Sequence, residues 1–97
     1  MRRRQRQVKT SMVQYRYLSA GETMPEMADD ELWLEIEASF DGRFFGTGCG
    51  RKLSGESVFY ISLPEDDVNL KTALSAATKW AGEHGVTCIW VQTTPAL

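Results

Sequence analysis

The chain holds few side chains that could act as nucleophiles. It has two cysteines, Cys49 and Cys88, and a single histidine, His84. A Cys–His pair also needs a group that orients the base and donors for an oxyanion, and no motif for either is present. His84 precedes Gly85 at the expected end of a helix, where the dipole favours a cation. We therefore interpret His84 as a capping residue and both cysteines as reduced, mostly buried thiols.

Glu35 and Glu37 are the carboxylates whose spacing suits acid–base chemistry. They lie two residues apart in a segment with a strand pattern, so they share one face, roughly 6–7 Å apart along the backbone. Outward charges on a half-buried strand are also ordinary surface residues. One histidine and two distant cysteines lack the paired spacing of a zinc site. We expect no catalytic residue, no metal and no cofactor.

Three alternating glycines precede two basic residues within positions 46–52. A phosphate-binding loop joins a strand to the N-terminus of a helix, whereas a turn and another strand are expected here. The alternation fits strand positions instead. Its structural interpretation is close approach of another segment. Its functional interpretation is a flat docking surface beside Trp33, Glu35 and Glu37.

Acidic residues are concentrated in one segment. Residues 22–37 contain no basic residue and seven acidic ones: Glu22, Glu26, Asp29, Asp30, Glu31, Glu35 and Glu37. Such a cluster attracts a basic partner and speeds encounter, and mimicry of nucleic acid is one form of that hypothesis. An exposed Trp33 among these acids would be a typical interface anchor. The alternative is a surface that only keeps the domain soluble.

Basic residues are concentrated at the start of the chain. Residues 1–9 contain no acid and five bases: Arg2, Arg3, Arg4, Arg6 and Lys9. Such an arm could contact several phosphates, but the acidic remainder of the chain counts against nucleic acid as the main partner. We expect residues 1–11 to form a disordered tail and residues 12–97 to form a single domain.

Residues 32–40 alternate apolar and polar side chains, which predicts a strand with one buried face. Asp41 and Gly42 follow and favour a two-residue type I′ turn. That turn would pair Ile36 with Thr47 and direct the three glycines outward, beside the two glutamates.

A second turn around Ser54 and Gly55 leads into a strand over residues 57–63. A two-residue loop would place Phe59, Ile61 and Leu63 over the glycines, whereas an odd-length loop or a bulge would direct them to the core. We expect a longer loop than two residues, because these side chains suit the core.

The remaining elements are a helix and two further strands. Residues 65–67 predict an acidic N-cap and first turn, and apolar residues at helical spacing follow up to Ala81. Gly82 and Gly85 indicate the end of the helix. Residues 13–18 and 86–92 have strand patterns. The predicted class is α+β: an antiparallel four- or five-stranded sheet (β-meander) with one main α-helix packed on one face, in the order ββββαβ.

Size and composition are those of one ordinary domain. The 97 residues are 42% hydrophobic and carry a net charge of −2, and no apolar run approaches the roughly 20 residues of a membrane helix. Polar residues follow positions 2–4 where a signal peptide would be apolar. Two cysteines make no disulfide framework. We expect a cytoplasmic protein with no membrane association.

The sequence favours a small non-enzymatic protein-binding or regulatory module, of inhibitor type among others, whose partner is a basic protein. The predicted contact residues are Trp33, Glu35, Glu37 and Arg43, with Asp29, Asp30 and Glu31 steering the encounter. The alternative is a nucleic-acid-associated protein that uses residues 1–9. A small enzyme based on the Cys/His or Glu/Glu groups is third. A homodimer is compatible with each, because the final strand or the glycine-rich hairpin would form an unprotected sheet edge.

Overall fold

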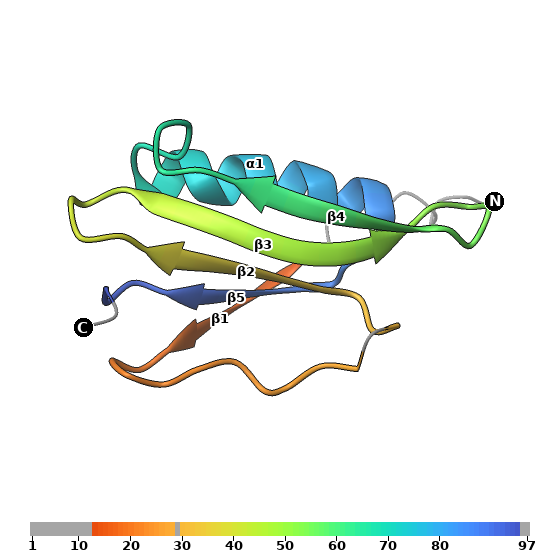
Figure 1. Ribbon diagram of the computed structural model, residues 1–97, viewed down its shortest axis with the longest axis horizontal. Coiled ribbons are helices and arrows are strands. Elements are labelled where there is room, and N and C mark those ends of the chain that lie inside the picture. Colours follow the sequence, from red (N-terminus) through yellow and green to blue (C-terminus); the bar gives the residue numbers. More distant parts are fainter. Residues whose placement is uncertain (1–12, 29, 96–97) are drawn as a thin grey trace, which may run out of the picture.

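The computed structural model describes residues 13–28 and 30–95. It is one five-stranded sheet with a single helix packed on one face (Figure 1). The elements follow in the order β1 (Gln14–Leu18), β2 (Trp33–Ala38), β3 (Phe44–Arg51), β4 (Ser57–Ser62), α1 (Leu70–His84) and β5 (Cys88–Gln92). The predicted tail, residues 1–11, lies outside the described residues. Within the described ranges, no helix is long and apolar enough to cross a membrane.

The sheet is mixed, so the predicted antiparallel meander is wrong. Its spatial order is β1-β5-β2-β3-β4. β5 runs parallel to both β1 and β2, whereas β3 is antiparallel to β2 and β4. A chain that returns to run parallel to an earlier strand needs a long crossover, and α1 provides it by carrying the chain from the edge strand β4 back to β5 beside β2. The final strand is therefore interior, and the sheet edges are β1 and β4.

The turn between β2 and β3 has three residues, and the predicted two-residue turn is wrong. The Ser39 amide donates to the Arg43 carbonyl oxygen at 2.8 Å, which leaves residues 40–42 as the loop. Gly42 has a φ of 84°, as is usual for the last residue of such a loop. Ile36 consequently pairs with Gly46, not Thr47. This shift of one position inverts every side chain of β3 relative to the prediction.

The glycines of β3 therefore face α1, and the predicted outward glycine surface is absent. A Cβ atom at Gly50 would lie 2.7 Å from Cβ of His84. One at Gly48 would lie 2.7 Å from the carbonyl oxygen of Trp33 on the neighbouring strand. Opposite the sheet, α1 presents three fully buried alanines: Ala73, Ala77 and Ala81. Small residues on both elements thus bring the helix close to the sheet.

The core lies between α1 and the sheet. Its larger members, all buried, are Leu34, Ile36, Val86, Ile89 and Val91. Tyr60 and Trp80 pack at its border with ring centroids 5.3 Å apart. This packing confirms the predicted buried face of the helix and, over residues 34–38, that of the second strand. Phe40, at the end of the same predicted strand, is instead 77% exposed in the turn.

The turn between β3 and β4 also has three residues. The Lys52 amide donates to the Glu56 carbonyl oxygen at 2.9 Å, and Gly55 has a φ of 91°. The prediction of a loop longer than two residues is confirmed, but the first hairpin is itself shifted, so the predicted core position of the next apolar residues is wrong. Phe59 and Ile61 are 71% and 72% exposed, and Leu63 is 53% exposed.

The helix begins later than predicted and ends as predicted. Asn69 is the N-cap, and its side-chain oxygen accepts from the Thr72 amide at 2.8 Å. The predicted acidic cap at residues 65–67 is instead part of the preceding turn, where Asp67 is buried and accepts a hydrogen bond from the Ser62 hydroxyl. Gly85, with a φ of 78°, caps the C-terminus.

Candidate functional site

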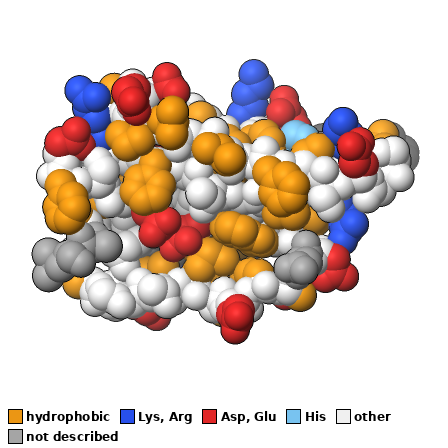
Figure 2. Space-filling view, viewed as in Figure 1, with side chains coloured by type: hydrophobic (Ala, Val, Ile, Leu, Met, Phe, Trp, Pro, Cys, Tyr) orange, Lys and Arg blue, Asp and Glu red, His pale blue; other side chains and the backbone are white. Residues whose placement is uncertain are grey.

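One face of the sheet is not covered by the helix. By the pairing of the strands, this open face carries Trp33, Glu35, Glu37, Phe45, Thr47, Cys49, Phe59, Ile61, Trp90 and Gln92. Figure 2 shows hydrophobic side chains gathered around acidic groups near the middle of the view. The open face is therefore a largely apolar surface with two carboxylates on its central strand.

The segment between β1 and β2 crosses one side of the open face. Gln92, only 8% exposed, ties it to β5. Its Nε2 atom donates to the carbonyl oxygens of Ser19 and Glu22, both at 2.7 Å, and its Oε1 atom accepts from the Thr94 amide at 2.9 Å. These bonds hold the segment in place as a wall beside β2.

A groove of about 800 Å³ opens between this segment, β2 and the turn after it. We call it the carboxylate groove and define it by Glu35, Glu37, Phe40, Phe45, Gln92 and Pro95. Phe45 pairs directly with Glu37 across β2 and β3. Both glutamates are half-buried. Two carboxylates are thereby set side by side among aromatic and aliphatic groups.

Burial and charge repulsion both act on Glu35. Burial, and after it the neighbouring charge of Glu37, together raise its pKa from the ordinary 4.5 to about 7. In the described part of the chain, the ion pairs are Arg43–Asp41 at 3.8 Å and Lys52–Glu56 at 3.4 Å. Neither involves the two glutamates. Among the described residues, no basic side chain therefore forms an ion pair with either glutamate of the groove.

Trp33 lies in a second, smaller hollow of about 420 Å³ on the same face. It is half-buried there, beside Met24, Met27 and Phe59. Glu35 lines both hollows. The exposure of Trp33 that would support its role as an interface anchor is thus present only in part.

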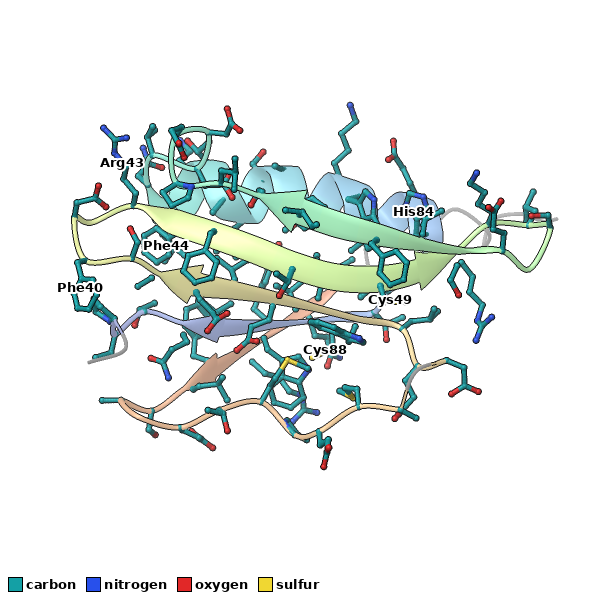
Figure 3. All side chains as sticks on the ribbon, in the orientation of Figure 1. Phe40, Arg43, Phe44, Cys49, His84 and Cys88 are labelled. Carbon is teal, nitrogen blue, oxygen red and sulfur yellow. The ribbon has the colours of Figure 1, made fainter. Side chains whose placement is uncertain are left out.

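The other predicted contact residues lie apart from the groove. Arg43 belongs to the turn after β2, and in Figure 3 it and Phe40 extend in different directions. The Asp30 carbonyl oxygen accepts from Arg51 at 2.8 Å, and the Glu31 carboxylate accepts from the Ala28 amide at 2.7 Å. Asp29 and the arm residues Arg2, Arg3, Arg4, Arg6 and Lys9 lie outside the described residues.

The thiols and the imidazole are not brought together. Cys49 is buried and Cys88 is half-buried, and both are free thiols. Both occupy strand positions that face the open face of the sheet. His84 lies on α1, where it stacks on Trp80 with centroids 4.4 Å apart and its Nδ1 lies 3.0 Å from the Trp80 carbonyl oxygen (Figure 3). Among residues 13–28 and 30–95, no cluster of three metal-ligating side chains occurs.

Sequence reasoning missed the aromatic and amide parts of this surface. Phe40, Phe45 and Gln92 line the groove, and Phe59 and Ile61 extend the apolar area toward the β4 edge. A three-residue loop at the first turn was the alternative that would have predicted this surface, because it places Phe45 beside Glu37.

No protein-family model matches the chain. No curated protein and no solved structure matches it either. The geometry of the open face is therefore the basis for interpreting function.

Proposed function

We propose that the protein is a non-enzymatic binding module that takes a basic protein partner on its open face. The observation that supports this most is the pair Glu35 and Glu37, without a described counter-charge, on a sheet face that no helix covers. An uncovered apolar area is typical of an interface, and carboxylates on it favour a partner of opposite charge.

The apolar part of the open face points to a partner that is not only basic. Phe59 and Ile61 are each more than 70% exposed, and large apolar side chains rarely remain so exposed together on an unpartnered surface. A partner with apolar side chains around a basic residue would cover both parts. Acidic residues of the segment before β2 would speed its approach by long-range attraction.

The contacts of the acidic residues argue against a mimic of nucleic acid. Glu22 accepts from the Ser19 amide at 2.7 Å and Glu31 from the Ala28 amide at 2.7 Å, so each forms a local cap. The carboxylates are therefore partly engaged in shaping the segment. Recognition centred on Glu35 and Glu37 fits this arrangement better than a phosphate-like array of charges.

Site-specific photocrosslinking in cells tests the proposal. A benzophenone amino acid replaces Ile61 on the open face, and a matched control carries it at Ala76, an exposed residue of α1. We expect a defined protein to be crosslinked from Ile61 and not from Ala76. Once purified, the crosslinked partner should bind the domain less tightly at high salt than at low salt.

Charge reversal of the two glutamates provides a second test of the proposed function. Glu35→Lys with Glu37→Lys should abolish crosslinking from Ile61 while the circular dichroism spectrum stays that of the folded domain. Equal crosslinking from both positions, or crosslinking that survives the reversal in a folded variant, would contradict the proposed function.

A further inference from the structure

We propose that the carboxylate groove is a site for a single lysine side chain, whose ammonium lies between Glu35 and Glu37 and whose apolar stem lies against Phe40 and Phe45. This inference rests on the proposed function and names the group that the partner presents. The two glutamates alternate on one strand, so both face the groove. Its volume of about 800 Å³ is ample for one long side chain.

Charge complementarity selects a cation. Among residues 13–28 and 30–95, two basic groups near the open face have partners elsewhere: Arg43 faces Asp41 at 3.8 Å, and Arg16 lies 5.8 Å from the centre of the Trp90 ring. Two neighbouring carboxylates with no cation between them repel one another, and an ammonium at hydrogen-bond distance from both removes that repulsion.

The shape and lining of the groove select lysine over a bare ion. Phe40, Phe45 and Pro95 supply apolar contact beside the carboxylates. A lysine carries a compact charge at the end of a flexible four-carbon stem, and such stems lie along apolar surface while the charge reaches polar groups. A metal ion would leave these aromatic walls unused.

Binding of a cation at this site is coupled to proton release. Glu35 has a pKa of about 7 in the free protein because of burial and of Glu37, and an ammonium favours its ionised form. The other charged groups toward this region are Glu22 and Glu26 of the segment before β2 and Arg16 of β1. Affinity should therefore rise between pH 6 and pH 8, by up to about tenfold if only ionised Glu35 binds.

Two peptides that differ only in the charge of one side chain test whether the ammonium group is required for binding. The probe is an N-acetylated, C-amidated pentapeptide with a central lysine between two phenylalanines and terminal leucines, and its control has norleucine in place of lysine. In amide-detected NMR titrations, we expect the lysine peptide to shift Glu35, Glu37 and Phe45. The norleucine peptide should bind at least tenfold more weakly.

Variants test the groove itself. Glu35→Gln and Glu37→Gln should each weaken the lysine peptide several-fold, and Glu35→Gln should also remove the rise in affinity with pH. Glu83→Gln, an exposed change on α1, is the matched control and should leave affinity unchanged.

The outcomes separate this inference from the proposed function. Equal binding of the norleucine peptide would overturn the lysine site and leave the open face as an interface. Equal binding of an arginine peptide would overturn the choice of lysine. Absence of any shift in the groove would also overturn the inference, even if Ile61 still crosslinks a partner. Lysine-peptide binding without any crosslinked protein would contradict only the proposed function.

Discussion

Glu35 links the open face to the stability of the domain. Its pKa is about 7 when folded against an ordinary value of 4.5, because of burial and then of Glu37. Between these two values the folded chain binds a proton that the unfolded chain has released. The free energy of unfolding therefore falls as pH rises from 4.5 to 7 and is constant above that range. The groove keeps a carboxylate in a position that weakens the fold at neutral pH.

Replacing Glu35 by glutamine should remove this dependence. We expect Glu35→Gln to match the original protein at pH 5 and to exceed its stability at pH 8 by about 1 kcal/mol, after allowance for solvent screening of a half-exposed group. This corresponds to a melting temperature about 5 °C higher at pH 8. Thermal denaturation at both pH values measures it. A Glu83→Gln control that behaves in the same way would contradict the prediction.

Gly48 and Gly82 differ in the space available for a larger side chain. We therefore predict opposite effects on stability when each is replaced by alanine. Gly48→Ala should lower the free energy of unfolding by about 1–3 kcal/mol, because the new Cβ meets the Leu34 side chain and the Trp33 carbonyl oxygen. Gly82→Ala, within α1, should raise it by about 0.5–1 kcal/mol, because no atom outside its chain neighbours and the backbone of its own helix lies within 4 Å of the new Cβ. Urea denaturation of both variants measures the difference, and equal effects would show that β3 is not packed this closely against Trp33 and Leu34 of β2.

At the scale of elements, short hydrogen-bonded loops and caps determine where each strand and helix begins. Both hairpins close through three-residue loops that end in a glycine of positive φ. Since loop length sets register, these two loops decide which side chains face α1 and which face solvent. The cap of α1 likewise depends on a single side chain, Asn69.

The position of this cap is testable. Asn69→Ala should lower the free energy of unfolding by about 1 kcal/mol, because the Thr72 amide loses its acceptor. Glu65→Ala, which removes an exposed member of the cap predicted from sequence, should change it by less than about 0.5 kcal/mol. Chemical denaturation compares the two, and a larger effect at Glu65 would place the start of the helix earlier.

At the scale of the whole molecule, the two faces of the sheet differ in whether a helix covers them. The helix covers one face of the sheet, whereas the open face ends at β4, an edge strand without a charged residue between Ser57 and Ser62. Uncharged edges with exposed apolar side chains favour association with another chain. The open face and this edge together are therefore the surface on which we propose that a partner or a second copy binds.

Self-association is the corresponding prediction. Without a partner, we expect the protein to associate at high concentration, and Ile61→Lys to reduce this by placing a charge on the edge strand. Ala76→Lys adds the same charge to the exposed side of α1 and should have no such effect. Sedimentation equilibrium of the three proteins measures their average mass. A monomeric original protein, or an equal effect of both lysines, would contradict it.

The sequence by itself determined the local elements and the position of the carboxylates on one strand. Alternation over β2, the alanine stripe of α1 and the glycine at its end are properties of neighbouring residues, and the structure agrees with each. Only the tertiary structure decided the face to which β3 and β4 turn, because a loop longer by one residue inverts a strand without changing its pattern. It also decided the insertion of β5 between β1 and β2. That pairing joins residues more than 50 positions apart, and its stability depends on burial of the shared core beneath α1, which no local pattern records.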